Sequence, residues 1–88
     1  MTEITFTKRA WEEYLAWQME DKKTLRRINM ILKDIDRNPF EGIAKPELLK
    51  YHKGCWSRRI DDKNRIVYKS EDDHILIIQC KGHYDDEA

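Results

Sequence analysis

Two stretches with helical hydrophobic periodicity fill most of the first half of the chain. In the first, apolar residues recur one, four and five positions after Ala10, which predicts an amphipathic helix with Thr7 as its N-cap. The second begins after Asp21, which we expect to cap it. It ends at Asn38-Pro39, because proline disfavours helical geometry in the residue before it. Its apolar stripe comprises Leu25, Ile28, Ile31, Leu32 and Ile35. The two nearly contiguous helices should form an antiparallel hairpin.

Alternation with a period of two predicts strands on both sides of this hairpin. Ile4 and Phe6 alternate with polar residues before the first helix, and a loop at 39–47 holds both prolines. The strands predicted after this loop cover 48–51, about 55–61, 65–71 and 74–83. This order predicts an α+β fold: β-α-α followed by an antiparallel β-meander, with both helices packed on one face of an antiparallel sheet.

The parity of the strand positions indicates which face of the sheet is the core. A three-residue turn with Asn64 in the left-handed conformation would place residue 61 opposite residue 65, whereas a two-residue turn would mix Arg65 with Ile60. The apolar face would then hold even-numbered residues: Trp56, Arg58, Ile60, Ile66, Tyr68, Leu76, Ile78 and Cys80. The opposite face would be polar and cationic: Ser57, Arg59, Arg65, Val67, Gln79, Lys81 and His83.

Two residues do not fit the apolar pattern. Arg58 falls on the core side, and we expect it near an edge with its guanidinium reaching solvent. Trp17 lies off the main stripe of the first helix, and we expect it to be exposed, as in a protein interface.

Composition limits the chain to one small domain. The 88 residues are 40% apolar and 39% charged, without a run of about 20 apolar residues or the apolar core of a secretory signal. Cys55 and Cys80 lack redox or metal-binding spacing, which indicates reduced thiols of a cytosolic protein. We predict a single domain over 1–84, an acidic tail at 85–88, a cytoplasmic location and no membrane partner.

Charge and spacing indicate an anion site. The net charge is zero, which argues against a generic nucleic-acid coat, but residues 44–84 carry nine basic and six acidic groups. Arg59 and Arg65 suit phosphate, and His83, on the same face, titrates near neutral pH. Glu47, between two lysines that would keep it ionised, is a candidate general base, and Tyr84 could stack on a nucleobase.

Each of these residues has an ordinary explanation when taken alone. A histidine at a strand end is usually just exposed, and a charged sheet face is usually solvated. Their shared parity favours an anion-binding face, including that of a nuclease. The scattered positions of His52, His74 and His83 argue against a metal site.

A set of motifs then points to a family. WEEYLAWQMEDKK, PFEG, KPELLK, WSRRI, RIVY and a terminal HY are highly specific in combination. Over nearly its full length the chain resembles the YoeB (Txe) toxins of the RelE superfamily, from bacterial toxin–antitoxin systems. The resemblance implies a RelE-like fold and a cytoplasmic mRNA endonuclease that works in the ribosomal A site without a cofactor. It also implies a cognate YefM-like antitoxin, operator DNA bound through the toxin–antitoxin complex, and a possible homodimer.

The resemblance assigns roles residue by residue. The catalytic positions of the family fall on Glu47, Lys50, Arg59, Arg65, His83 and Tyr84. Glu47 would take the proton from a ribose 2′-OH and His83 would protonate the leaving 5′-oxygen, with the arginines and Lys50 stabilising the phosphorane. The product would be a 2′,3′-cyclic phosphate or a 3′-phosphate, and DNA would not be cut. Further candidates for RNA binding are Lys45, Lys53, Arg58 and Lys81.

Three departures from the family pattern leave alternatives open. Gly82 stands where a larger residue is common, Asn64 stands where a histidine is common, and acids at 85–87 follow the proposed catalytic acid. One alternative is a non-cleaving homologue that binds antitoxin or ribosome. Another is a metal-free ribonuclease acting on free RNA.

Overall fold

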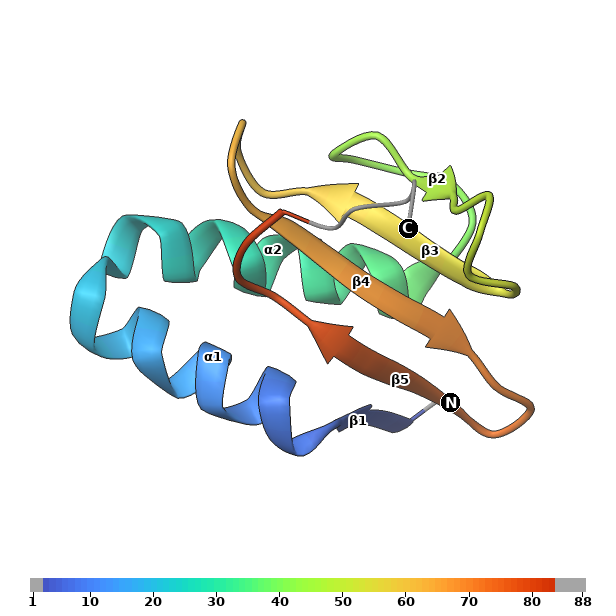
Figure 1. Ribbon diagram of the computed structural model, residues 1–88, viewed down its shortest axis with the longest axis horizontal. Helices are drawn as coiled ribbons and strands as arrows, with labels where there is room; N and C mark the ends of the chain where they lie inside the picture. Colours follow the sequence, from blue (N-terminus) through green and yellow to red (C-terminus); the bar gives the residue numbers. More distant parts are fainter. Residues whose placement is uncertain (1–2, 84–88) are drawn as a thin grey trace.

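A five-stranded sheet covered on one face by two helices makes up the described part of the computed structural model, residues 3–83 (Figure 1). The strand order is β1-β5-β4-β3-β2. The elements are β1 (Glu3–Phe6), α1 (Lys8–Glu20), α2 (Lys22–Arg37), β2 (Glu47–Leu48), β3 (Cys55–Arg59), β4 (Arg65–Ser70) and β5 (His74–Gln79). No helix in this part of the chain is long and apolar enough to cross a membrane.

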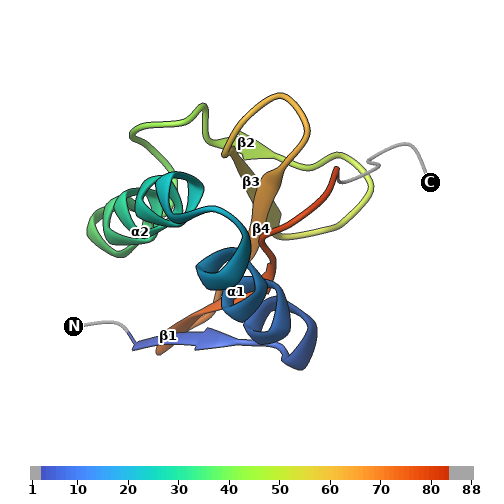
Figure 2. The ribbon, with the colours of Figure 1, turned by 90° about the vertical axis from the view of Figure 1, so that its left-hand side faces the viewer.

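The helical hairpin forms as predicted, and both caps are confirmed. The Thr7 hydroxyl accepts a hydrogen bond from the Ala10 amide, and the Asp21 carboxylate accepts from the amides of residues 23 and 24. The middle of the α2 stripe, Ile28 and Ile31, is fully buried against the sheet. Figure 2 shows α1 and α2 on the same side of the strands.

Trp17 corrects one prediction, because it is buried in the core rather than exposed. Its indole Nε1 donates a 2.8 Å hydrogen bond to the carbonyl oxygen of Cys80. This bond satisfies the only polar atom of the indole, so burial of the ring costs little. Cys55 and Cys80 are free thiols, and burial raises the pKa of Cys80 to about 12, which leaves it unreactive.

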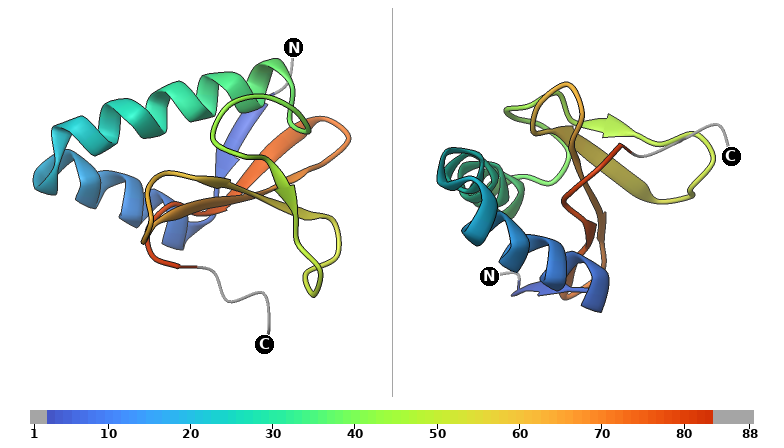
Figure 3. Two further views of the ribbon diagram at one scale, coloured as in Figure 1. Left: turned by 90° about the horizontal axis from the view of Figure 1, so that it is seen from above. Right: turned by 60° about the vertical axis from the view of Figure 1, so that its left-hand side comes forward.

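The sheet is mixed rather than antiparallel throughout. Strands β3, β4 and β5 form the predicted antiparallel meander, but β1 pairs with β5 in parallel, with Ile4 opposite Ile75. Figure 3 shows β1 at one edge of the sheet and β2 near the other. The predicted antiparallel sheet is therefore wrong for β1, because an alternating pattern identifies a strand but carries no information on its direction.

The turn between β3 and β4 differs from the prediction in length but not in parity. Arg59 pairs with Arg65, so five residues connect the strands, and Asn64 is not among the residues of 3–83 with a positive φ. The Asp61 carboxylate builds the turn by accepting from the amides of Lys63 and Asn64. Because the pairing moves by two residues, every side chain keeps its predicted face on these two strands.

A β-bulge changes the faces on β5. The register shifts between Val67 and Tyr68, so Val67 pairs with Gln79 while Tyr68 pairs with Ile77. As a result Ile75 and Ile77 point into the core instead of the predicted Leu76 and Ile78. Cys80 lies in the core, as predicted.

Candidate active site

The face of the sheet opposite the helices carries one row of directly paired positions from β2 to β5. Glu47 pairs with Ser57, Ser57 with Val67, and Val67 with Gln79. Neighbouring strands are about 5 Å apart, so the exposed Glu47 carboxylate begins a row that crosses the sheet. Ser57, Val67 and Gln79 are buried and form the floor of the candidate site.

The two predicted site arginines lie opposite each other two residues further along, about 7 Å from this row. The Arg65 guanidinium is fixed, because its Nη1 donates to the carbonyl oxygens of Asp61, at 2.5 Å, and Asn64, at 3.0 Å. Arg59 is looser: 43% of its side chain is exposed, and its ion pair with the solvated Asp62 spans 4.0 Å. Two arginines therefore occupy paired positions at one end of the face, and the guanidinium group suits a phosphodiester.

The C-terminal segment reaches the same end of the sheet. The Gly82 amide donates to the Asn64 side chain at 2.8 Å, and its carbonyl oxygen accepts from the Arg65 amide at 3.1 Å and from Gln79 Nε2 at 3.3 Å. These bonds anchor the residue before His83 next to Arg65 in the sheet, and the His83 side chain is exposed. Tyr84 and the tail at 85–88 lie outside the described residues.

Gly82 and Asn64, two of the departures from the family pattern, are hydrogen-bonded to each other, and we call this contact the Gly82 joint. Gly82 has a φ of 92°, a conformation that side-chain-bearing residues rarely adopt. Asn64 supplies the acceptor for the Gly82 amide. A glycine at this position therefore allows a turn that the asparagine fixes.

Glu47 is placed through the backbone before and after it. Ala44 and Lys45 both have a positive φ, and the Ala44 carbonyl oxygen accepts a 2.7 Å bond from the Arg59 amide. After β2, the Leu49 amide donates to the Cys55 carbonyl oxygen at 2.9 Å. The backbone around Glu47 is therefore tied to both ends of β3. The lysines near it, Lys45, Lys50 and Lys53, have exposed side chains.

Two of the residues predicted to bind RNA do not lie on this face. Arg58 is fully buried on the helix side, so the expectation that its guanidinium reaches solvent or RNA is wrong. Lys81 turns toward α1, where its Nζ contacts the Glu20 carboxylate at 2.7 Å and lies 5.3 Å from the centre of the Trp17 ring. Its pairing with α1 removes Lys81 from the cationic face on which parity had placed it.

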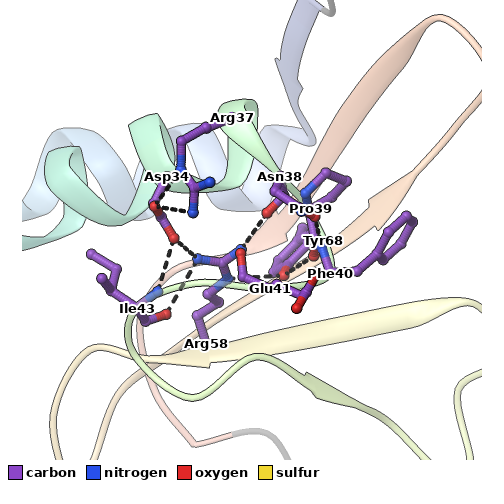
Figure 4. A network of polar contacts seen from close by, with 9 residues as sticks. All are labelled: Asp34, Arg37, Asn38, Pro39, Phe40, Glu41, Ile43, Arg58 and Tyr68. Atoms are coloured by element: carbon purple, nitrogen blue, oxygen red, sulfur yellow. Dashed lines mark hydrogen bonds and ion pairs between the residues drawn. The ribbon is translucent and has the colours of Figure 1, made fainter.

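A buried polar network around Arg58, on the helix side of the sheet, was not predicted from the sequence. Arg58 binds Asp34 and Tyr68, which lie on α2 and β4 (Figure 4). The Ile43 amide and Arg58 lower the pKa of Asp34 to about 2, and burial raises the pKa of Tyr68. Asp34 is therefore ionised and Tyr68 neutral at physiological pH. The one sign of this network in the sequence was an arginine at a strand position whose parity assigned it to the apolar face.

The arrangement joins an exposed carboxylate, two guanidinium groups and an exposed imidazole along one side of the sheet. A carboxylate and an imidazole could serve as base and acid for a phosphodiester bound at this anion site. Within residues 3–83, no group of three or more histidine, cysteine, aspartate and glutamate side chains could hold a metal ion.

Known proteins resemble this chain in sequence and in fold. A family model described as the YoeB-like toxin of bacterial type II toxin–antitoxin systems matches residues 6–84. Toxin YoeB of Streptomyces coelicolor is 51% identical over 82 residues, which are 92% of this chain and 98% of that protein.

Solved structures give the same relationship. The YoeB dimer from Staphylococcus aureus superposes with a TM-score of 0.86 at 47% identity, over 94% of this chain and 98% of that one. A chain of the heterotetrameric YoeB–YefM toxin–antitoxin complex from the same organism gives 0.85 at 49% identity, over 96% and 99%. On this evidence, the chain belongs to the YoeB-like toxins of bacterial type II toxin–antitoxin systems.

Proposed function

We propose that the chain is a ribosome-dependent mRNA endonuclease that cuts mRNA in the A site and so inhibits translation. Cleavage proceeds by acid–base catalysis without a metal ion. The 2′-OH of one nucleotide attacks the adjacent phosphorus, the bond to the 5′-oxygen of the next nucleotide breaks, and a 2′,3′-cyclic phosphate forms. The cytoplasm is the compartment in which such an enzyme meets its substrate.

The roles follow from the chemistry of each group. Glu47 accepts the 2′-OH proton, and His83 donates a proton to the departing 5′-oxygen. Arg59 and Arg65, with Lys50, stabilise the negative charge that grows on the non-bridging oxygens. Tyr84, next to the acid in the sequence, stacks on a base or orients the phosphate. Lys45 and Lys53 contact the RNA backbone.

One observation supports the proposal above all: the backbone pairing of β2, β3 and β4, together with the bonds of Gly82. Glu47 pairs with Ser57, Arg59 pairs with Arg65, and Arg65 bonds to the residue before His83. This backbone pairing supports a site in which residues of three strands and the C-terminal segment act on one phosphodiester.

The exposure of this site supports a dependence on the ribosome. The side chains of Glu47, Arg59 and His83 are exposed, and the ion pair of Arg59 with Asp62 is long, at 4.0 Å. Holding a substrate in the attacking geometry can supply about 7–11 kcal/mol of the barrier. We propose that the ribosome provides this positioning.

The partner is a cognate YefM-like antitoxin that neutralises the toxin, and operator DNA is bound only by the toxin–antitoxin complex. The YoeB–YefM complex from Staphylococcus aureus supports the first point, and the YoeB dimer supports a homodimer of this chain. Helix α1 has exposed apolar side chains that are available for such protein contacts, at Trp11, Leu15 and Met19.

The test is a stalled ribosome–mRNA complex treated with purified protein, without added metal beyond the Mg²⁺ that the ribosome itself requires. The expected result is a cut within the A-site codon that is lost in both Glu47→Ala and His83→Ala. Equally fast cleavage of free mRNA would contradict the ribosome dependence. Tight ribosome binding without any cut would identify a non-cleaving homologue.

A further inference from the structure

The side chain of Arg58 is fully buried, yet its hydrogen bonding is complete. A guanidinium has five N–H donors. Those of Arg58 meet five acceptors: Tyr68 Oη at 3.1 Å, Asp34 Oδ2 at 2.5 Å, and the carbonyl oxygens of Asn38, Glu41 and Ile43 at 2.7, 3.3 and 3.2 Å. Figure 4 shows these contacts converging on the planar group.

Three of the five acceptors are main-chain carbonyls of one segment, residues 38–46, which we call the 38–46 loop. The two side-chain partners of Arg58 bind this loop as well. Tyr68 Oη donates to the Pro39 carbonyl oxygen at 2.6 Å, and Asp34 Oδ2 accepts from the Ile43 amide at 2.9 Å. The loop between α2 and β2 is therefore wrapped around a single guanidinium, and Arg58 determines its path.

Gly42 shows how closely the loop follows the ion pair. It has a φ of 139°, and a Cβ there would overlap the Asp34 carboxylate and lie 3.1 Å from Arg58 Nη1. Only glycine allows the backbone to pass at this distance in this conformation. The close approach is a second indication that the loop is shaped by the buried pair.

The 38–46 loop leads directly into the strand that carries Glu47. Near the end of the loop, the carbonyl oxygen of Ala44 accepts from the Arg59 amide at 2.7 Å. Strand β2 is only two residues long and lies at the edge of the sheet. Two paired residues define the position of a strand only weakly, so the position of β2 also depends on the loop before it.

We infer that Arg58 is a positioning residue for Glu47: its five hydrogen bonds hold the 38–46 loop and thereby fix the carboxylate of β2 relative to the arginines on the other face of the sheet. The inference rests on the proposed function for its consequence in catalysis. Its structural half, the dependence of β2 on Arg58, does not need that function.

The decisive variants are Tyr68→Phe and Arg58→Lys. Phenylalanine removes one donor to the loop and one acceptor of Arg58 while keeping the ring in the core. Lysine keeps the charge but has three donors on a flexible stem instead of a planar fork. Ile75→Val, on β5 and far from the loop in the strand order, is the control for a general loss of stability.

Amide hydrogen exchange tests the structural half without any RNA. The Arg59 amide, bonded to Ala44, reports attachment of the loop, and the Thr7 amide, bonded to Ile77 at 3.0 Å, is the reference. We expect the Arg59 amide to exchange about tenfold faster in Tyr68→Phe with the Thr7 amide within about twofold, because the loop opens locally. Equal acceleration of both amides, as expected for Ile75→Val, would overturn the inference.

Single-turnover cleavage on stalled ribosomes tests the catalytic half. Tyr68→Phe should lower the rate at saturating ribosomes about 10- to 100-fold, with the half-saturating concentration within about twofold. Ile75→Val should leave both unchanged. An unchanged rate in Tyr68→Phe with a faster Arg59 amide would overturn the link to Glu47. Absence of cleavage by the wild type would refute the proposed function, and the exchange result would still decide whether Arg58 holds β2.

Discussion

Arg58 and Arg59 are consecutive residues of one strand with opposite environments. Arg58 is fully buried and bound by five acceptors, whereas 43% of the Arg59 side chain is exposed with one long ion pair. The period of two along a strand points one guanidinium toward the 38–46 loop and the other toward the candidate active site. The same side chain can thus serve as a fixed internal support or as an available anion contact, depending on how its donors are satisfied.

The comparison predicts that, of these two arginines, Arg59 has the larger effect on activity. We expect Arg59→Ala to lower cleavage on ribosomes about 10²- to 10³-fold, because a donor to the transition-state charge is lost. The free energy of unfolding should change by no more than about 0.5 kcal/mol, since within residues 3–83 the side chain makes only the long ion pair with exposed Asp62. Rapid-quench kinetics and urea unfolding measure the two quantities. A variant that loses stability but keeps its cleavage rate would reverse the assignment.

The neighbouring substitution, Arg58→Met, should do most of its damage to the fold. Each buried acceptor left without a donor costs about 1–3 kcal/mol, and we expect a total loss of about 3 kcal/mol after the loop relaxes. The urea midpoint measures this loss, with Arg59→Ala as the matched control one residue away. Equal stability of the two variants would remove the basis of the comparison.

Acid should lower the stability of the fold by protonating Asp34, the ion-pair partner of the buried Arg58. The folded pKa of Asp34, about 2, lies below its ordinary value of 3.8, so the ionised carboxylate contributes stability above pH 4. That contribution is lost as the pH falls from about 4 through about 2, because protonation then favours the unfolded chain. Urea midpoints across this range should fall less steeply in Asp34→Asn than in the wild type. Parallel curves would contradict the role of this carboxylate.

The smallest effect is expected for Lys81, which parity placed on the cationic face and the structure places against α1. Lys81→Met should change cleavage by less than about threefold and unfolding free energy by about 0.5–1 kcal/mol, the range for an exposed ion pair with a cation–π contact. Lys53→Met, on the exposed side of the loop before β3, is the comparison. A larger loss of activity for Lys81→Met than for Lys53→Met would indicate that Lys81 binds RNA after all.

Parity explains how much of this could be predicted from the sequence. The face of each residue on β3 and β4 depends only on whether the pairing shifts by an even number, so an error of two in the turn left Arg59 and Arg65 correctly placed. On β5 the bulge introduced a shift of one, and Leu76 and Ile78 were assigned to the wrong face. The Gly82 joint before His83 depends on a backbone conformation that residue spacing does not reveal.

Burial of polar side chains was the least predictable feature. Arg58 is satisfied mostly by main-chain carbonyls, which every residue has, and by a carboxylate 24 positions earlier in the chain. No local pattern identifies such partners. Trp17 was misplaced for a similar reason, since its hydrogen bond goes to a carbonyl 63 residues away.

The most direct test of the central claim uses stalled ribosomes that carry an mRNA with a single 2′-deoxy substitution in the A-site codon. If Glu47 activates the 2′-OH, the wild-type protein will cut the all-ribose message to leave a 2′,3′-cyclic phosphate or 3′-phosphate. It will not cut the bond that follows the deoxynucleotide. Cleavage of that bond at a comparable rate would show that the nucleophile is not the 2′-OH, and the roles assigned to Glu47 and His83 would be wrong.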